Sequence, residues 1–206
     1  DGNNIIDDGF SGLLNKIEMP KIKRIYFNNN KITCEYLHNE IENFIFFKNL
    51  RMLNLKNNQI GDIGFFNIFK IFKFPKILEI NFSFNRISAK NFGGFLAENE
   101  ISLTFDDLKY LYFEENKIDD EGFREILDCF KCPKIKKLMF NKNFITASDE
   151  EKLPKLSLLF LEYFFLAENL IEVKSLGNIT ANISMPKVKI FSIDKEIAVD
   201  KILDNF

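Results

Sequence analysis

The chain of 206 residues is 46% hydrophobic and carries 28 basic and 30 acidic side chains, a formal net charge of -2. This content suffices for one or two domains with a hydrophobic core, and the balanced charge offers no basic footprint for nucleic acid. The longest nearly apolar run, at 156–167, is shorter than the roughly 20 residues of a spanning helix and contains Glu162. We therefore expect neither nucleic-acid binding nor membrane insertion.

Cysteine and asparagine usage point to different compartments. Three cysteines (Cys34, Cys129, Cys132) cannot all pair within one chain, which favours a reducing, intracellular compartment. Three N-x-[ST] matches, at Asn81, Asn178 and Asn182, point toward secretion, although an Asn-rich chain produces such matches by chance. The chain begins at Asp1 without a signal peptide, so secretion after removal of such a peptide stays open.

One frame recurs along the chain: apolar residues spaced as L-x-x-L-x-L, then an Asn, then another apolar residue. Copies start near residues 22, 50, 77, 108, 135, 161 and 188, and the copy at 188 has Glu196 where the Asn is expected. Residues 1–20 form a partial first repeat that begins after its strand, so we expect either further repeats before it or another element that covers this end. Intervals of 26 to 31 residues between successive Asn indicate a tandem array. The Asn positions are Asn3, Asn30, Asn58, Asn85, Asn116, Asn143 and Asn169.

Three copies continue past the Asn as N-x-I-x-D-x-G. The residues concerned are Asn3, Ile5, Asp7, Gly9; Asn58, Ile60, Asp62, Gly64; and Asn116, Ile118, Asp120, Gly122. The chain resembles the leucine-rich repeat family, and this segment resembles its ribonuclease-inhibitor-type branch. The resemblance implies a single α/β domain over 1–206, a curved solenoid with a parallel β-sheet on the concave face and short helices on the convex face.

The remaining elements are predicted in chain order. Apolar residues at helical spacing predict convex helices over 64–74 and 122–132. The longest Asn interval indicates a convex insertion near 98–107, and two copies without Asp-x-Gly, at Ser88 and Thr146, should have convex turns of another kind. At 156–166 two strand registers compete, and we favour Leu161, Phe164, Leu166 over Leu156, Leu159, Leu161 because it keeps Asn169 in place. A capping helix is expected over about 196–206.

Each frame position has a physical reason. The three apolar side chains face the core, where stacked copies cover one another's sheets. The Asn amide, with two donors and an acceptor, can bond backbone groups of its own loop and of the next loop, which predicts a buried Asn ladder.

Candidate chemical groups are few. The single histidine, His38, is expected on the convex surface without a nucleophile nearby, and the acidic run 119–121 is expected to cap a helix. Cys129 and Cys132 form a C-x-x-C, but aligned copies place them in largely apolar columns, and no second Cys/His pair completes a zinc site. No glycine-rich phosphate loop is present. We expect no enzyme activity, cofactor or metal.

Side chains between the core positions should face the concave surface, because they alternate along a strand. The predicted binding residues there are Tyr26, Tyr110, Tyr112, Met139, Tyr163 and Phe165. The last five should form one aromatic patch over three adjacent repeats, of the residue types enriched in interfaces. A mostly basic column along one rim could steer an acidic partner. It comprises Lys23, Arg51, Leu78, Lys109, Lys136, Glu162 and Lys189.

The leading hypothesis is a non-catalytic scaffold that binds another protein through the concave sheet. Two alternatives stay open. One is regulation of a GTPase, because the Ran GTPase-activating protein has the same repeat type, although none of its active-loop residues matches here; GTP hydrolysis assays would test it. The other is a structural subunit of a large assembly.

Overall fold

The computed structural model describes residues 2–16, 21–37, 41, 44–149 and 153–193. The helix expected at 196–206 and the histidine His38 lie outside these residues. Within them, one all-parallel sheet has seven strands in the order β1-β3-β5-β6-β7-β9-β11. The strands are β1 (Arg24–Tyr26), β3 (Met52–Asn54), β5 (Glu79–Asn81), β6 (Tyr110–Tyr112), β7 (Lys137–Met139), β9 (Tyr163–Phe165) and β11 (Ile190–Ser192).

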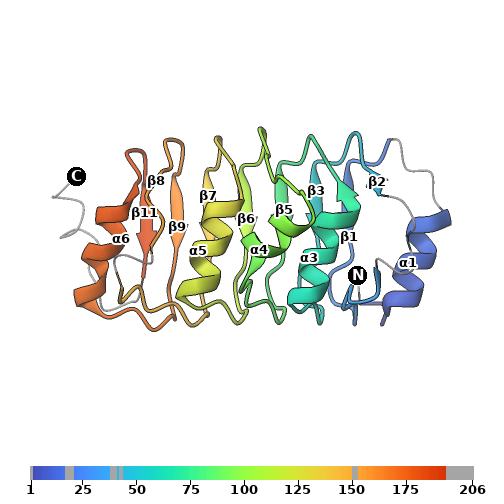
Figure 1. The fold of residues 1–206 in the computed structure, drawn as a ribbon, viewed down its shortest axis with the longest axis horizontal. Helices are drawn as coiled ribbons and strands as arrows, with labels where there is room; N and C mark the ends of the chain where they lie inside the picture. The colour runs from blue at the N-terminus through green and yellow to red at the C-terminus, as the bar shows by residue number, and fades with distance from the viewer. Residues whose placement is uncertain (1, 17–20, 38–40, 42–43, 150–152, 194–206) are drawn as a thin grey trace.

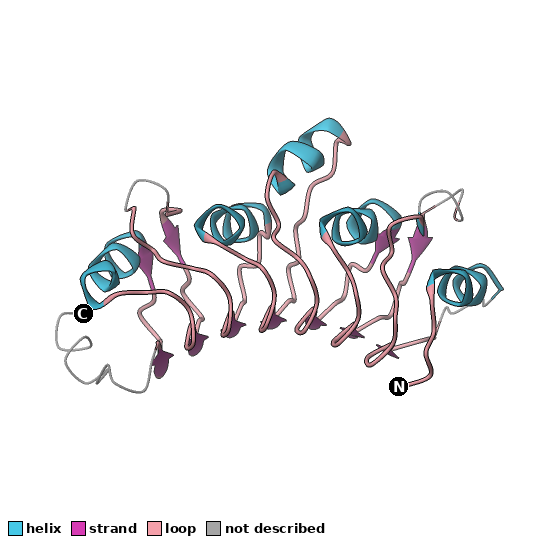
Figure 2. Ribbon diagram, turned by 90° about the horizontal axis from the view of Figure 1, so that it is seen from below, coloured by secondary structure: helices cyan, strands magenta, loops and turns pink. Residues whose placement is uncertain are grey.

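Helices cover the other side of this sheet. They are α1 (Asp7–Lys16), α3 (Asp62–Ile71), α4 (Phe92–Glu98), α5 (Asp120–Cys129) and α6 (Leu176–Asn182), the last preceded by the 3-10 turn η2 (Val173–Ser175). Along the chain, α3 lies between β3 and β5, α4 between β5 and β6, α5 between β6 and β7, and α6 between β9 and β11 (Figure 1). Seen end-on, the strands line the inner side of an arc and the helices its outer side (Figure 2). The predicted α/β solenoid with a concave sheet is confirmed.

The strand register follows the predicted frame. Phe164 of β9 is buried and pairs with Leu138 of β7, so the register Leu161, Phe164, Leu166 is confirmed. The competing register is wrong, because Leu156 belongs to a separate short strand, β8 (Leu156–Ser157), outside the concave sheet.

The predicted convex helices exist but lie slightly earlier in the chain than expected: they begin at Asp62 and Asp120 and end before the predicted ends. α3 ends at Ile71 and α5 at Cys129, whereas the spacing predicted helix as far as 74 and 132. The chain then turns extended, at β4 (Phe72–Lys73) after α3 and at a bridge through Lys131 after α5. Phe72, Lys73 and Phe74 alternate apolar and polar, as in a strand, but Phe72 also fits the apolar spacing of the helix before it. The sequence pattern alone therefore could not show where the helix ends and the strand begins.

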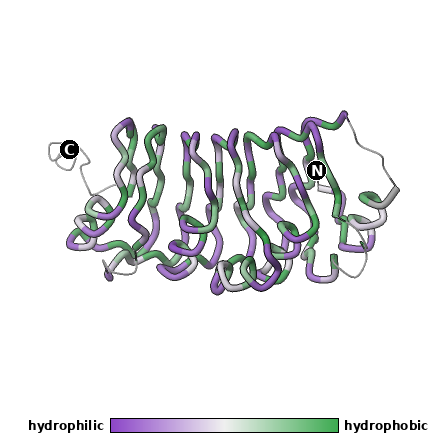
Figure 3. The backbone as a smooth tube through the Cα atoms, turned by 45° about the horizontal axis from the view of Figure 1, so that its top comes forward, coloured by the Kyte–Doolittle hydropathy of each residue, from purple (hydrophilic) through white to green (hydrophobic). Residues whose placement is uncertain are grey.

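Phenylalanine fills the core between the sheet and the helices. Phe82, Phe113 and Phe140, equivalent residues of successive repeats, stack with ring centroids 5.6 and 5.5 Å apart. Phe65 of α3 is fully buried and meets Phe82 edge-on at 5.2 Å. In each coil the hydrophobic segments recur at the same place (Figure 3). Such aromatic pairs contribute about 0.5–1.5 kcal/mol each beyond the burial of their area.

A second set of short strands lies on the flank where the chain returns from the helices to the concave sheet. In the described part of the chain these form two two-stranded parallel sheets and one isolated bridge. β2 (Ile45–Phe46) pairs with β4, Thr104 bridges to Lys131, and β8 pairs with β10 (Ile183–Ser184). Figure 2 shows the two strand pairs as separate units among the outer helices. This flank ladder therefore joins repeats two by two instead of running continuously.

At the edge of the molecule opposite the flank ladder, an aspartate side chain joins two neighbouring repeats at every second boundary between repeats. We call this arrangement the aspartate clamp. Asp62 accepts hydrogen bonds from the Ser88 N–H (2.7 Å), the Ser88 hydroxyl (2.6 Å) and the Ala89 N–H (2.8 Å) of the next repeat. Asp7 holds Thr33 and Cys34 in the same way, and Asp120 holds Thr146 and Ala147. The two copies expected to have different convex turns, at Ser88 and Thr146, thus supply the donors of the clamp.

Candidate functional site

The Asn ladder fixes the loops that follow the concave strands. The Asn116 side-chain amide donates to the carbonyls of Phe82 (3.0 Å), Phe113 and Glu114 (both 3.2 Å), while its oxygen accepts from the Ile87 N–H (3.0 Å). Asn58, Asn85 and Asn143 repeat this pattern, each bonding the preceding repeat as well as its own. Asn30 and Asn169 have the corresponding bonds. Asn3 differs, because its side chain is exposed and its backbone N–H donates to Asn30.

Strand pairing places the predicted concave residues in two columns. One column aligns Tyr110, Lys137 and Tyr163; the next aligns Tyr112, Met139 and Phe165. All six side chains are half-buried, and the residue between the columns in each strand is fully buried. The five predicted patch residues, Tyr110, Tyr112, Met139, Tyr163 and Phe165, therefore lie together on three adjacent strands; we call them the aromatic patch.

Lys137 lies within this patch, although the sequence reasoning did not select it. Its Nζ is 5.5 Å from the ring centroid of Tyr112 and 5.3 Å from that of Phe165. A cation over an aromatic face is attracted by about 0.5–1 kcal/mol at exposed sites. The two rings thus hold one positive charge at the centre of an otherwise uncharged surface. The signal was present in the sequence, because Lys137 falls in the same column as Tyr110 and Tyr163.

Burial shifts the ionisation of groups at the edge of the patch. It raises the pKa of Tyr112 to about 12, helped by the negative charges of Glu79 and Glu114. It also raises the pKa of the Glu79 carboxyl, which the positive charges of Lys137 and Arg24 partly oppose. Tyr112 therefore stays a neutral hydroxyl donor at physiological pH.

Tyr26 is separate from the other predicted binding residues. Tyr26 lies on β1. In its column the next two strands, β3 and β5, carry Asn54 and Asn81, so two asparagines separate Tyr26 from Tyr112. Its exposed fraction is 46%. Tyr26 shares the concave face without extending the aromatic patch.

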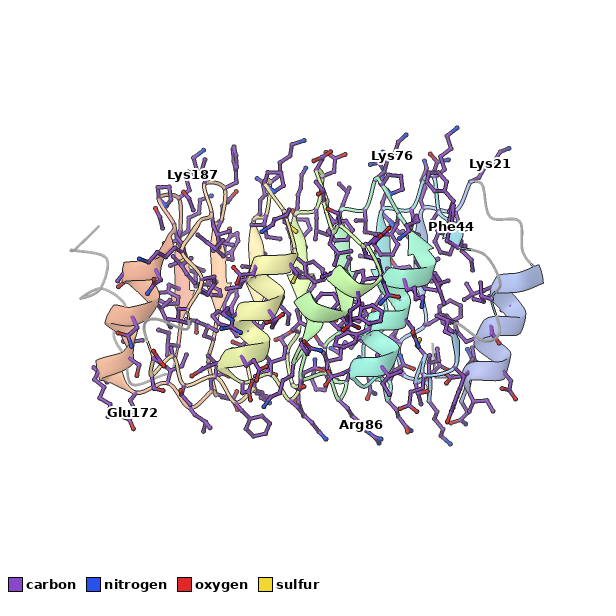
Figure 4. All side chains as sticks on the ribbon, in the orientation of Figure 1. Lys21, Phe44, Lys76, Arg86, Glu172 and Lys187 are labelled. Carbon is purple, nitrogen blue, oxygen red and sulfur yellow. The ribbon has the colours of Figure 1, made fainter. Side chains whose placement is uncertain are left out.

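The predicted basic rim is interrupted by an ion pair network. Glu162 accepts hydrogen bonds from Lys136 (2.9 Å) and Lys189 (2.6 Å), and these bonds lower its pKa to about 2. The lysines at this end therefore neighbour a permanent negative charge. Figure 4 shows Lys21, Lys76 and Lys187 along the same edge of the molecule, with Arg86 and Glu172 at the opposite edge.

The insertion predicted near 98–107 follows α4. Its residues Leu103 and Phe105 are buried, and Thr104 between them makes the bridge to Lys131. In Figure 2 the middle helix, α4, projects farther outward than its neighbours. The extra residues thus lengthen the convex side of this coil, and the last of them, Leu103 and Phe105, are again part of the hydrophobic core.

The acidic run 119–121 has structural partners. Asp119 caps α5 by accepting from the Gly122 N–H (3.2 Å) and pairs with Lys90 at 2.6 Å. Asp120 is the clamp residue described above. The expected capping is confirmed for Asp119. Among the residues that the structure describes, no group of three His, Cys, Asp or Glu side chains could hold a metal ion.

We predict that the C-x-x-C thiols react slowly in the folded protein. Burial raises the pKa of Cys129 to about 11 and that of Cys132 to about 12, so almost no thiolate exists at neutral pH. Alkylation by iodoacetamide at pH 7.5, followed by mass spectrometry, should be at least about tenfold slower than in the urea-unfolded chain at the same pH, because unfolding restores a pKa of about 8.5. Equal rates would contradict this assignment.

The comparison with known proteins agrees with this architecture. A family model described as Leucine Rich repeat matches residues 48–68. The matched segment runs from the turn before β3 through the ladder residue Asn58 into α3. Leucine-rich repeat domains typically mediate protein binding and are usually non-catalytic. No curated protein matches the chain. Among the residues that the structure describes, no helix is long and apolar enough to cross a membrane.

Proposed function

We propose that this protein is a non-catalytic scaffold that binds a protein partner through its concave sheet, centred on the aromatic patch. The observation that carries the proposal is the alignment of five half-buried Tyr, Phe and Met side chains on three adjacent strands around Lys137. Tyr is enriched at energetic hot spots of interfaces, and aromatic residues and Met are enriched in their buried centres.

The geometry of the patch supports binding without large rearrangement. The side chains stand on a hydrogen-bonded sheet whose loops are tied by the Asn ladder, so little conformational freedom is lost on association. Tyr112 keeps its proton, and Lys137 supplies one positive charge. These features suit a partner with an apolar surface that carries a hydrogen-bond acceptor and a carboxylate.

We expect the double substitution Tyr112→Ala and Phe165→Ala to weaken partner binding by at least about 2 kcal/mol, the scale of a hot-spot truncation. A photo-crosslinking residue at Tyr110 would first capture the partner from an extract of the source cell for identification by mass spectrometry. Titration of the purified partner against wild-type and double-variant protein then gives the affinities, and circular dichroism reports whether the array stays folded.

The matched control replaces two exposed apolar residues off the sheet, Ile63→Ala on α3 and Phe144→Ala on the edge loop, which are 61% and 52% exposed. This variant should bind the partner as the wild type does. A folded concave variant with unchanged affinity, or an off-sheet variant with the larger loss, would refute the proposal.

A further inference from the structure

The flank ladder has two gaps between unpaired strand edges. It joins β2 to β4, Thr104 to Lys131, and β8 to β10, but across the described residues no backbone pairing links β4 to 103–105 or 130–132 to β8. The clamps of Asp62 and Asp120 hold these same two junctions at the opposite edge. The repeats on either side of each gap are therefore joined at the clamp and at the concave sheet while their flanks stand apart.

The backbone groups that face the second gap follow from the pairing pattern. In a parallel ladder, one residue directs both its N–H and its C=O to one neighbour, and the next residue directs them to the other. Leu158 donates to Ser184, so Ser157 directs its N–H and C=O toward repeat 130–132. Lys131 bonds Leu103 and Phe105 on its other side, so the Phe130 C=O and Cys132 N–H face Ser157. None of these four groups has a hydrogen-bond partner among the described residues.

The gap between these edges is an apolar groove with a volume of about 260 Å³. Its floor comes from core residues of α5 and the concave sheet, including Ile126, Leu127 and Leu138. This volume lies below the roughly 300–1,000 Å³ of pockets for drug-sized ligands. The backbone groups of a helix are bonded within the helix, whereas an extended strand directs backbone N–H and C=O groups to both of its sides and can pair with two edges at once.

The neighbouring flank segments indicate which sequence such a strand would have. In four of them a polar residue lies between two apolar ones, with the apolar side chains directed into the core. These are Phe72-Lys73-Phe74, Leu103-Thr104-Phe105, Leu156-Ser157-Leu158 and Ile183-Ser184-Met185. A tripeptide of this pattern, placed parallel between the two edges, would offer a partner to each of the four open groups. Its central N–H and C=O would pair with Phe130 and Cys132, and its flanking groups would pair with Ser157.

We propose that the groove between residues 130–132 and β8 binds an extended segment of another polypeptide, with the pattern apolar–small polar–apolar, as an added parallel strand. Main-chain hydrogen bonds to both edges would give the affinity, and the apolar floor would select the side chains. The gap between β4 and 103–105 has the same edge arrangement and also a volume of about 260 Å³. This site is separate from the concave aromatic patch.

The probe is the peptide acetyl-Lys-Leu-Ser-Leu-Lys-amide, titrated into isotope-labelled protein and followed by NMR. Saturable shifts and slowed hydrogen exchange at the Cys132 and Ser157 amides are expected. Ser157→Pro removes one groove-facing N–H and no bond to β10, so it should weaken peptide binding on the order of tenfold. Ser157→Ala keeps the N–H and should bind as the wild type does.

A second test changes only the ligand. The same peptide with its central Ser N-methylated loses the donor for Phe130 and should also bind on the order of tenfold more weakly. The Tyr112→Ala, Phe165→Ala protein should bind the probe normally, which separates this proposal from the concave one. Absence of saturable binding at millimolar peptide, or binding indifferent to both Ser157→Pro and N-methylation, would overturn it.

Discussion

Asn116→Ala should destabilise the array by roughly 3 kcal/mol or more, since several buried groups lose a partner at about 1–3 kcal/mol each. Asn116 is 6% exposed. Its loss leaves the Ile87 N–H and carbonyls of two repeats, including that of Phe82, without their bonds, and alanine has no group to replace them. Urea unfolding followed by circular dichroism measures the change.

The matched control is Asn57→Gly. Asn57 is exposed, adjoins the ladder residue Asn58, and has a positive φ of 54° that glycine adopts readily. Its side chain donates to Asn29 at the surface. We expect a change within about 1 kcal/mol, the scale of one exposed hydrogen bond. Equal effects of the two substitutions would show that the ladder bonds do not stabilise the fold.

Gly122→Ala should also be strongly destabilising, by roughly 3 kcal/mol, the upper part of the usual range for overpacking. A Cβ at this position would lie 1.8 Å from the Ser88 carbonyl oxygen of the preceding repeat. Because that atom belongs to the backbone, a side-chain rotation cannot relieve the clash, and α5 must move away from its neighbour. Thermal unfolding measured by calorimetry gives the magnitude.

Gly177→Ala is the control within the same class of element. Gly177 lies in α6, and a Cβ there would meet no atom within 4 Å. Alanine has the higher helix propensity, so this substitution should stabilise the protein by about 1 kcal/mol or less. Opposite signs for the two glycines are expected, and a neutral Gly122→Ala would mean that the helix and the preceding repeat are not in close contact.

The sequence determined the concave sheet better than the convex side. The period of two in the strands and the Asn that follows all of them except β11 identify which residues are buried, and Phe164 and Leu138 pair as that pattern predicts. The convex side lacks such a marker. Phe72 and Phe74 suit a helix and a strand equally, so the helix ends and the flank ladder could not be predicted.

The candidate site was predictable in position but not in detail. The columns that contain Tyr112 and Phe165 follow from strand alternation alone. The placement of Lys137 over both rings depends on side-chain rotamers, which no spacing rule provides. The Asp62 clamp was visible only as a motif in alternate repeats, because its donor, Ser88, lies 26 residues along the chain.

The alternation of clamp and flank ladder makes two consecutive coils, not one, the repeating unit of the array. The coil that contains Asp62 is clamped to the following coil, which supplies the Ser88 hydroxyl. That second coil is in turn paired along the flank, through Thr104 and Lys131, with a third coil that again carries a clamp aspartate. Loss of the single coil that carries Ser88 would set two coils with a clamp aspartate side by side, and Asp62 would lose the hydroxyl that it binds. We therefore expect an array shortened or lengthened by one coil to be less stable than one shortened or lengthened by two.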